Sequence, residues 1–144
     1  MDAGRFTLNR PERKRVADAI TAAESNTCGE IVVRVVPHAK GAPRDHALRE
    51  FQRLGLEKTR DRTGVLLFVA AKDHAIEVLG DAGIHAKVPA GFWDAVVAKL
   101  SAAFRAGRHA EGLCEAVREI GALLSVHFPC KSDDTNELPD HPVI

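Results

Sequence analysis

The chain has 144 residues, of which 45% are hydrophobic and 28% charged, a composition typical of one globular domain rather than a disordered chain. Twenty basic residues balance twenty acidic ones, so we do not expect a protein that binds nucleic acid or an anionic membrane through general electrostatic attraction. No apolar run is long enough to span a bilayer and the N-terminus lacks a secretory signal, so we predict a cytoplasmic protein with no membrane anchor in this chain.

Helix-forming and strand-forming patterns alternate along the first half of the chain. Asn9 can cap a helix whose first turn contains Pro11, and apolar residues then recur at helical spacing, namely Val16, Ala19, Ile20 and Ala23. Residues 30–36 are rich in β-branched side chains and predict a first strand, which Pro37 ends. A second amphipathic helix is expected over residues 44–59.

Two further strands are predicted in the middle of the chain. Residues 64–71 are apolar on both faces, as expected of a strand that helices cover on two sides. The short segment 72–74 can form a hairpin turn, so residues 75–79 should pair antiparallel with that strand. Because a helix connects the first strand to the second, these two strands should be parallel.

The second half of the chain is predicted to be helical. Apolar residues recur at helical spacing over residues 90–106 and 109–127, and Gly107 can end the first of these helices. The alternation of helices and strands predicts an α/β fold, with helices packed against a sheet. We expect one domain over residues 1–129, followed by a polar tail over residues 130–144.

Acidic residues should gather at one edge of this sheet. The first two strands begin at that edge and the antiparallel third strand ends there, so Glu30, Asp61 and Asp81 are predicted to lie near one another. Carboxylates held together repel unless a metal cation or an arginine lies between them, and Ca²⁺ and Mg²⁺ prefer oxygen ligands. Gly80 and Gly83 would let backbone carbonyl groups approach such an ion. This edge is a candidate metal site.

The same residues also have a purely structural interpretation. Gly80 and Gly83 can simply form a sharp turn that Asp81 caps, while Arg62 pairs with Asp61. Both interpretations remain open at the level of sequence.

The opposite edge of the sheet offers another candidate site. His38 follows the first strand, and Asp73 and His74 lie in the hairpin turn. Ligands of open α/β sheets usually bind at this edge, and a set of two histidines and one aspartate could hold zinc. We find no motif for a catalytic nucleophile, a phosphate-binding loop or a dinucleotide site, so it is uncertain whether the protein is an enzyme.

Four segments together resemble the TPM domain family, named from thylakoid-lumen, photosystem-repair and receptor-auxiliary proteins. They are GEIVVRV (29–35), RTGVLLFVA (62–70), LGDAGIHAKVP (79–89) and FRAGRHAEGL (104–113). The resemblance runs over residues 23–129, and the chain is similar to the short standalone bacterial branch of the family.

The resemblance implies a three-layer α/β/α sandwich with a small mixed sheet of about four strands. Members of the family are associated with divalent metals, and an acid phosphatase activity has been suggested for plant members. Many relatives also carry a signal sequence and a membrane anchor. Gly80, Asp81 and Gly83 fit the family's Gly-rich turn, while Glu30 and Gly64 fit its first two strands.

Three functions are therefore considered. The first is a soluble module that binds a divalent cation, Ca²⁺ or Mg²⁺, at the carboxylate edge and acts through an unknown protein partner. The second is a modest acid phosphatase whose bound cation would polarise the phosphate and activate water. The third is a non-catalytic interaction domain that meets a partner through Phe92 and Trp93 or through the basic N-terminal helix.

Overall fold

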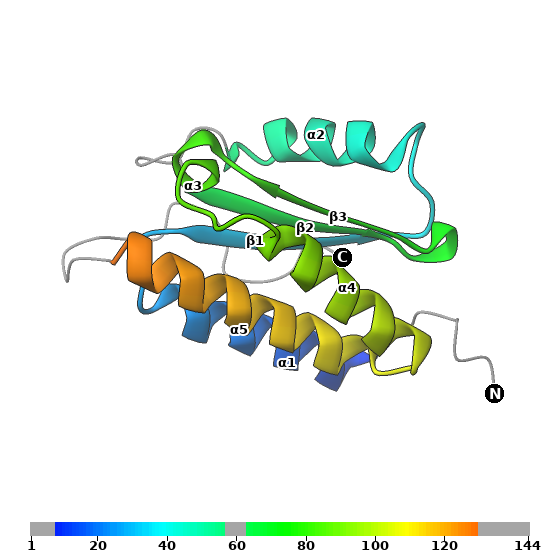
Figure 1. Ribbon diagram of the computed structural model, residues 1–144. Coiled ribbons are helices and arrows are strands. Elements are labelled where there is room, and N and C mark those ends of the chain that lie inside the picture. Colours follow the sequence, from blue (N-terminus) through cyan, green and yellow to red (C-terminus); the bar gives the residue numbers. More distant parts are fainter. Residues whose placement is uncertain (1–7, 57–62, 130–144) are drawn as a thin grey trace.

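The computed structural model describes residues 8–56 and 63–129 (Figure 1). The predicted tail and the predicted metal ligand Asp61 lie outside the described residues. The elements in chain order are α1 (Arg10–Glu24), β1 (Glu30–Val36), α2 (Pro43–Arg53), β2 (Gly64–Ala70), the 3₁₀ turn η2 (Ala71–Asp73), β3 (Ala75–Gly80), α3 (Ala82–His85), α4 (Phe92–Arg105) and α5 (His109–His127).

The described sheet has three strands in the order β1-β2-β3. Strand β1 pairs parallel with β2, and β2 pairs antiparallel with β3, so the predicted strand directions are confirmed. The expected number of about four strands is too high for the described part of the chain. Every described segment after β3 that has regular structure is helical, in keeping with the helical spacing of its apolar residues.

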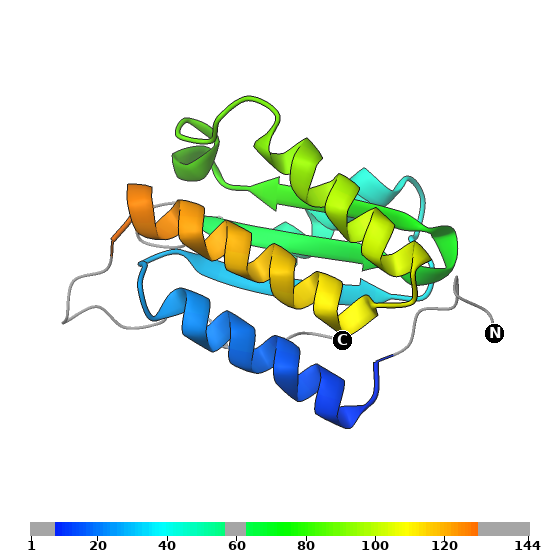
Figure 2. The same ribbon diagram turned by 60° about the horizontal axis from the view of Figure 1, so that its bottom comes forward.

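Strand β2 is buried along its whole length and separates two hydrophobic clusters. Because side chains alternate across a strand, Val65, Leu67 and Val69 face helices α1, α4 and α5. The intervening residues of β2 face α2 on the other side of the sheet. Figures 1 and 2 show the resulting three layers, with α2 alone on one face, so the predicted sandwich is confirmed.

Helix boundaries follow local capping chemistry. Asn9 caps α1 as predicted: its side chain accepts a hydrogen bond from the backbone N–H of Glu12 at 2.9 Å, and the Glu12 carboxylate accepts one from the Asn9 N–H at 2.9 Å. Helix α2 ends at Arg53, earlier than the predicted residue 59, because the chain turns at Gly55 with a left-handed φ of +74°. Gly107, with φ of +78°, follows α4 as expected.

The backbones of helices α1 and α5 approach closely where two small residues, Ala23 and Gly121, are in contact. A Cβ atom built on Gly121 would lie 2.6 Å from the Cβ of Ala23, which is closer than two non-bonded carbon atoms can approach. Glycine in a helix ordinarily costs about 1 kcal/mol relative to alanine. At Gly121 the contact with α1 reverses this preference.

We therefore predict that Gly121→Ala lowers the free energy of unfolding by about 1–3 kcal/mol, the usual range for overpacking, instead of raising it. Urea denaturation with circular dichroism measures the change. Ala23→Gly provides the control because it removes the atom that clashes. The double variant should lose less stability than the sum of the two single variants, and strictly additive losses would contradict the contact.

Candidate functional site

The carboxylate edge predicted from the sequence forms around Gly64. Glu30, the first residue of β1, pairs with Gly64 in the parallel register. On the other side, the backbone N–H of Asp81 donates to the carbonyl oxygen of Gly64 at 2.9 Å. One strand therefore separates Glu30 from Asp81, and the separating residue has no side chain.

Both carboxylates lie on the α2 face of the sheet. Glu30 lies two residues before Val32 and therefore faces the same side of the sheet, where Val32 packs in the α2-side cluster. A Cβ atom on Gly80 would point toward Trp93 and Ile84 on the opposite face, at 3.1 and 3.2 Å. Asp81 continues the extended chain, with φ of −70° and ψ of 170°, so its side chain leaves on the α2 side.

A backbone oxygen also approaches this position. A Cβ atom on Gly64 would lie only 2.7 Å from the carbonyl oxygen of Leu56, so the chain after α2 passes directly over Gly64. Glu30 and Asp81 are 2% and 6% exposed. Two buried carboxylates and a carbonyl oxygen therefore gather around Gly64, and all are oxygen donors of the kind that hard cations prefer.

The structural interpretation of Asp81 is also supported. Its Oδ1 atom accepts a hydrogen bond from the backbone N–H of Ala82 at 2.8 Å and caps the short helix α3, which the sequence analysis did not predict. Gly80 ends β3 and Gly83 lies within α3, and neither has a positive φ. The absence of a side chain at Gly80 makes room for the Trp93 ring.

Glu24 lies close to this end of the sheet but has a structural task. Its Oε2 atom accepts the backbone N–H of Ile31 at 2.7 Å, so the carboxylate joins the end of α1 to the outer edge of β1. Among residues 8–56 and 63–129, no three His, Cys, Asp or Glu side chains come close enough to hold a metal ion. Glu30 and Asp81 lie at the same edge, and the set that includes Asp61 stays a prediction.

Comparison with known proteins identifies the family. A family model described as the TPM domain matches residues 4–123. The chain belongs to the TPM domain family. The resemblance inferred from the sequence is thus confirmed.

Solved structures with the same fold include the BA42 protein from the psychrophilic bacterium Bizionia argentinensis. It is 34% identical, with a TM-score of 0.88, and the match covers 96% of this chain and 95% of that one. The N-terminal domain of a protein from P. gingivalis is 22% identical, with a TM-score of 0.69 and coverage of 88% and 81%, and shows the fold alone. No curated protein matches the sequence significantly.

The opposite edge of this TPM domain does not form the zinc site considered above. The Nδ1 atom of His38 donates to Asp73 Oδ1 at 2.7 Å, and the N–H of Ala39 donates to Asp73 Oδ2 at 2.7 Å. These two hydrogen bonds hold the pKa of Asp73 below its ordinary value. Asp73 thus fastens the end of β1 to the hairpin turn, and these side chains do not form a metal-binding group with His74.

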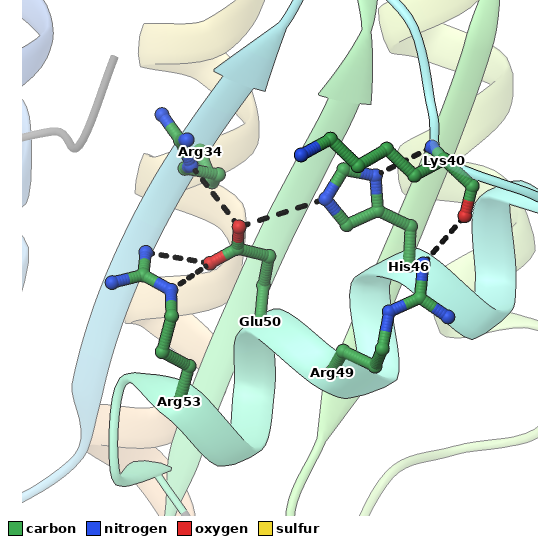
Figure 3. Close-up of polar contacts among 6 residues, drawn as sticks. All are labelled: Arg34, Lys40, His46, Arg49, Glu50 and Arg53. Carbon is green, nitrogen blue, oxygen red and sulfur yellow. Dashed lines mark hydrogen bonds and ion pairs between the residues drawn. The ribbon is translucent and has the colours of Figure 1, made fainter.

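A buried ionic cluster on α2 of the TPM domain was missed by the sequence analysis. Glu50 is 8% exposed and lies among basic groups from β1 and α2 (Figure 3). Arg53 places Nη2 and Nε at 2.6 and 2.7 Å from Glu50 Oε2, and Arg34 Nε lies 3.7 Å from Oε1. The helical spacing of His46, Glu50 and Arg53 was a usable sign, but the partner on β1 depends on tertiary packing.

His46 is held in one orientation within this cluster. Its Nδ1 atom accepts the backbone N–H of Lys40 at 3.0 Å, and its ring packs against Phe68 with centroids 4.9 Å apart. Since Nδ1 is an acceptor, the network assigns the ring hydrogen to Nε2, which faces Glu50 Oε1 at 3.6 Å (Figure 3). The cluster anchors α2 to the sheet on the same face as the carboxylate edge.

Opposing effects act on the pKa of Glu50. Burial by itself raises the pKa, but the hydrogen bond from Arg53 and the charges of Arg53 and Arg34 outweigh it, so the net pKa lies below its ordinary value. The folded state therefore favours the ionised carboxylate. This stabilisation is complete above the unfolded-state pKa of about 4.3 and is lost as the pH falls through the lower pKa of the folded state.

We predict that Glu50→Gln lowers the free energy of unfolding by about 2 kcal/mol at neutral pH, because charge-assisted hydrogen bonds are lost. The difference from the parent protein should shrink below about pH 4 as Glu50 itself becomes protonated in the parent. Urea denaturation across a pH series measures both effects. Glu119→Gln, which breaks an exposed pair with Lys99, is the control and should cost much less. A Glu50→Gln difference that does not depend on pH would contradict the assignment.

None of the helices in the described ranges has the combination of length and apolarity that a membrane span requires.

Proposed function

We propose that this TPM domain binds a divalent cation, Ca²⁺ or Mg²⁺, through Glu30 and Asp81 and acts through a protein partner. The observation that carries the proposal is that both carboxylates are buried on one face of the sheet, on either side of Gly64. Asp61, predicted from the sequence as a further ligand, lies in the connection between α2 and β2, outside the described residues.

The energetic argument for a cation is the repulsion between two carboxylates held at one edge of the sheet. A divalent ion between them would offset this repulsion, and carboxylate oxygens are ligands that Ca²⁺ and Mg²⁺ prefer. The carbonyl oxygen of Leu56 over Gly64 would add a neutral oxygen donor of the type common in calcium sites.

We predict that Asp81→Asn weakens Ca²⁺ or Mg²⁺ binding by roughly tenfold or more, because one buried anionic ligand is lost. Asparagine caps a helix about as well as aspartate, so α3 should remain intact and the fold should survive. Isothermal titration of each metal into chelator-treated protein measures the change. Glu30→Gln should weaken binding in the same way.

Asp94→Asn is the matched control, because Asp94 also lies at the start of a helix but is exposed. It should bind the metal as the parent does. Equal binding by the parent and Asp81→Asn would show that the metal lies elsewhere, and the proposal would fail. Binding that weakens equally in Asp94→Asn would indicate only a general effect of charge.

The phosphatase alternative depends on the same cation and can be tested with the same variants. It requires hydrolysis of a generic phosphomonoester that disappears on chelation and in Asp81→Asn. Metal binding without turnover would favour the binding module. If the domain binds no cation, the remaining alternative is the interaction domain, which predicts a partner whose binding is insensitive to chelator.

A further inference from the structure

A second candidate site lies at the other end of the sheet, away from Glu30 and Asp81. A cavity of about 500 Å³ opens where the hairpin between β2 and β3 meets the end of α4 and the start of α5. Figures 1 and 2 show these segments together at the right-hand end of the domain. The volume is within the range of small-molecule pockets, roughly 300–1,000 Å³.

The floor of this cavity, here called the hairpin pocket, is apolar. Val69, Ala71 and Ile76 come from the hairpin, and Phe104 comes from α4. Phe104 also packs edge-on against the ring of His109, with centroids 5.5 Å apart and an interplanar angle of 65°. A ligand that enters the pocket must therefore offer an apolar body to these side chains.

The polar groups that line the hairpin pocket include one permanent positive charge and several hydrogen-bond donors. They are the Arg105 guanidinium, the imidazoles of His74 and His109, and the hydroxyl of Ser101. None of the described residues that line the pocket is acidic. Because arginine is always charged and the other three groups can donate hydrogen bonds, the pocket complements a negative ligand group.

His74 lines the hairpin pocket despite an unfavourable backbone conformation. Its φ of 53° is left-handed, the only such value among the described non-glycine residues. Glycine would adopt this conformation without strain, so the backbone alone does not explain the imidazole.

We propose that the hairpin pocket binds a small organic carboxylate that carries an apolar body, with the carboxylate at Arg105 and the apolar body against Phe104 and Ile76. The position agrees with the general tendency of open α/β sheets to bind ligands beyond the carboxyl ends of their parallel strands. The site shares no residue with the proposed cation site, so each proposal can fail without the other.

Phenylacetate is a suitable probe, and two related compounds distinguish the contribution of its ring from that of its charge. Phenylethanol keeps the ring without the charge, and acetate keeps the charge without the ring. In an amide NMR titration, phenylacetate should cause saturable shifts at Ala71, Ile76 and Phe104. The affinity of each comparison compound should be lower than that of phenylacetate by roughly tenfold or more, since each lacks one of the two interactions.

Two variants test the residues that would hold the carboxylate. Arg105→Met should weaken phenylacetate binding by roughly tenfold or more and leave phenylethanol unchanged. His74→Gly should also weaken phenylacetate while relieving the strained backbone, so the fold should be retained. Lys87→Met, which removes an exposed positive charge after α3, is the control and should bind as the parent does.

Three results would overturn the proposal. Shifts that do not saturate, or that map away from the hairpin pocket, would mean that no site exists there. Equal affinity for phenylethanol and phenylacetate would remove the case for an anion. Equal weakening in Arg105→Met and Lys87→Met would show that net charge, and not the Arg105 contact, controls binding.

Discussion

The burial of β2 on both faces is the constraint from which the architecture follows. All seven residues of this strand are buried. Their side chains alternate between two separate hydrophobic clusters, one on each face of the sheet. Each buried leucine or phenylalanine contributes about 1.5–3 kcal/mol relative to exposure. That stabilisation is available only if helices cover both faces, which places α2 on one side and α1, α4 and α5 on the other.

The two ends of the sheet differ in the polar groups that they carry. At the start of β2, Gly64 lies between the positions of two buried carboxylates, Glu30 and Asp81. At the end of β2, Val69 and Ala71 form part of the floor of a pocket whose charged lining group is Arg105. A chain with no net charge thus places two buried carboxylates at one end of this strand and an arginine near the other. Overall composition predicts neither of them.

The sequence predicts the elements whose patterns are local. The β-branched run at residues 30–36, the uninterrupted apolar segment after Gly64 and the cap at Asn9 each specify their own structure. The strand directions could then be predicted from the helical connection between the first two strands and the short turn before the third. These directions in turn predict that Glu30 and Asp81 lie at the same edge of the sheet. The elements and the strand directions could be predicted because the patterns that specify them involve residues close together in the chain.

Features that depend on contacts between distant elements could not be predicted in this way. The charge of Arg34 on β1 is matched by Glu50 on α2, and nothing near Arg34 in the chain indicates that partner. The close approach of Ala23 and Gly121 requires the relative position of two helices. His38 and Asp73 were predicted to share an edge, but sequence could not show that both oxygens of Asp73 are committed to the end of β1.

Helices α1 and α5 run in the same direction (Figure 2), and this has a practical consequence for attaching anything to the molecule. The backbone N–H of Cys28 donates to the carbonyl oxygen of Phe128 at 3.0 Å, so the described chain finishes beside the start of β1, whereas it begins beside the first turn of α5. A label or surface tether attached at the exposed start of α1 would stand at the end of the molecule that holds the hairpin pocket. One attached at the exposed Pro129 would stand at the opposite end, beside the start of β1, so the choice of attachment point decides which end remains accessible.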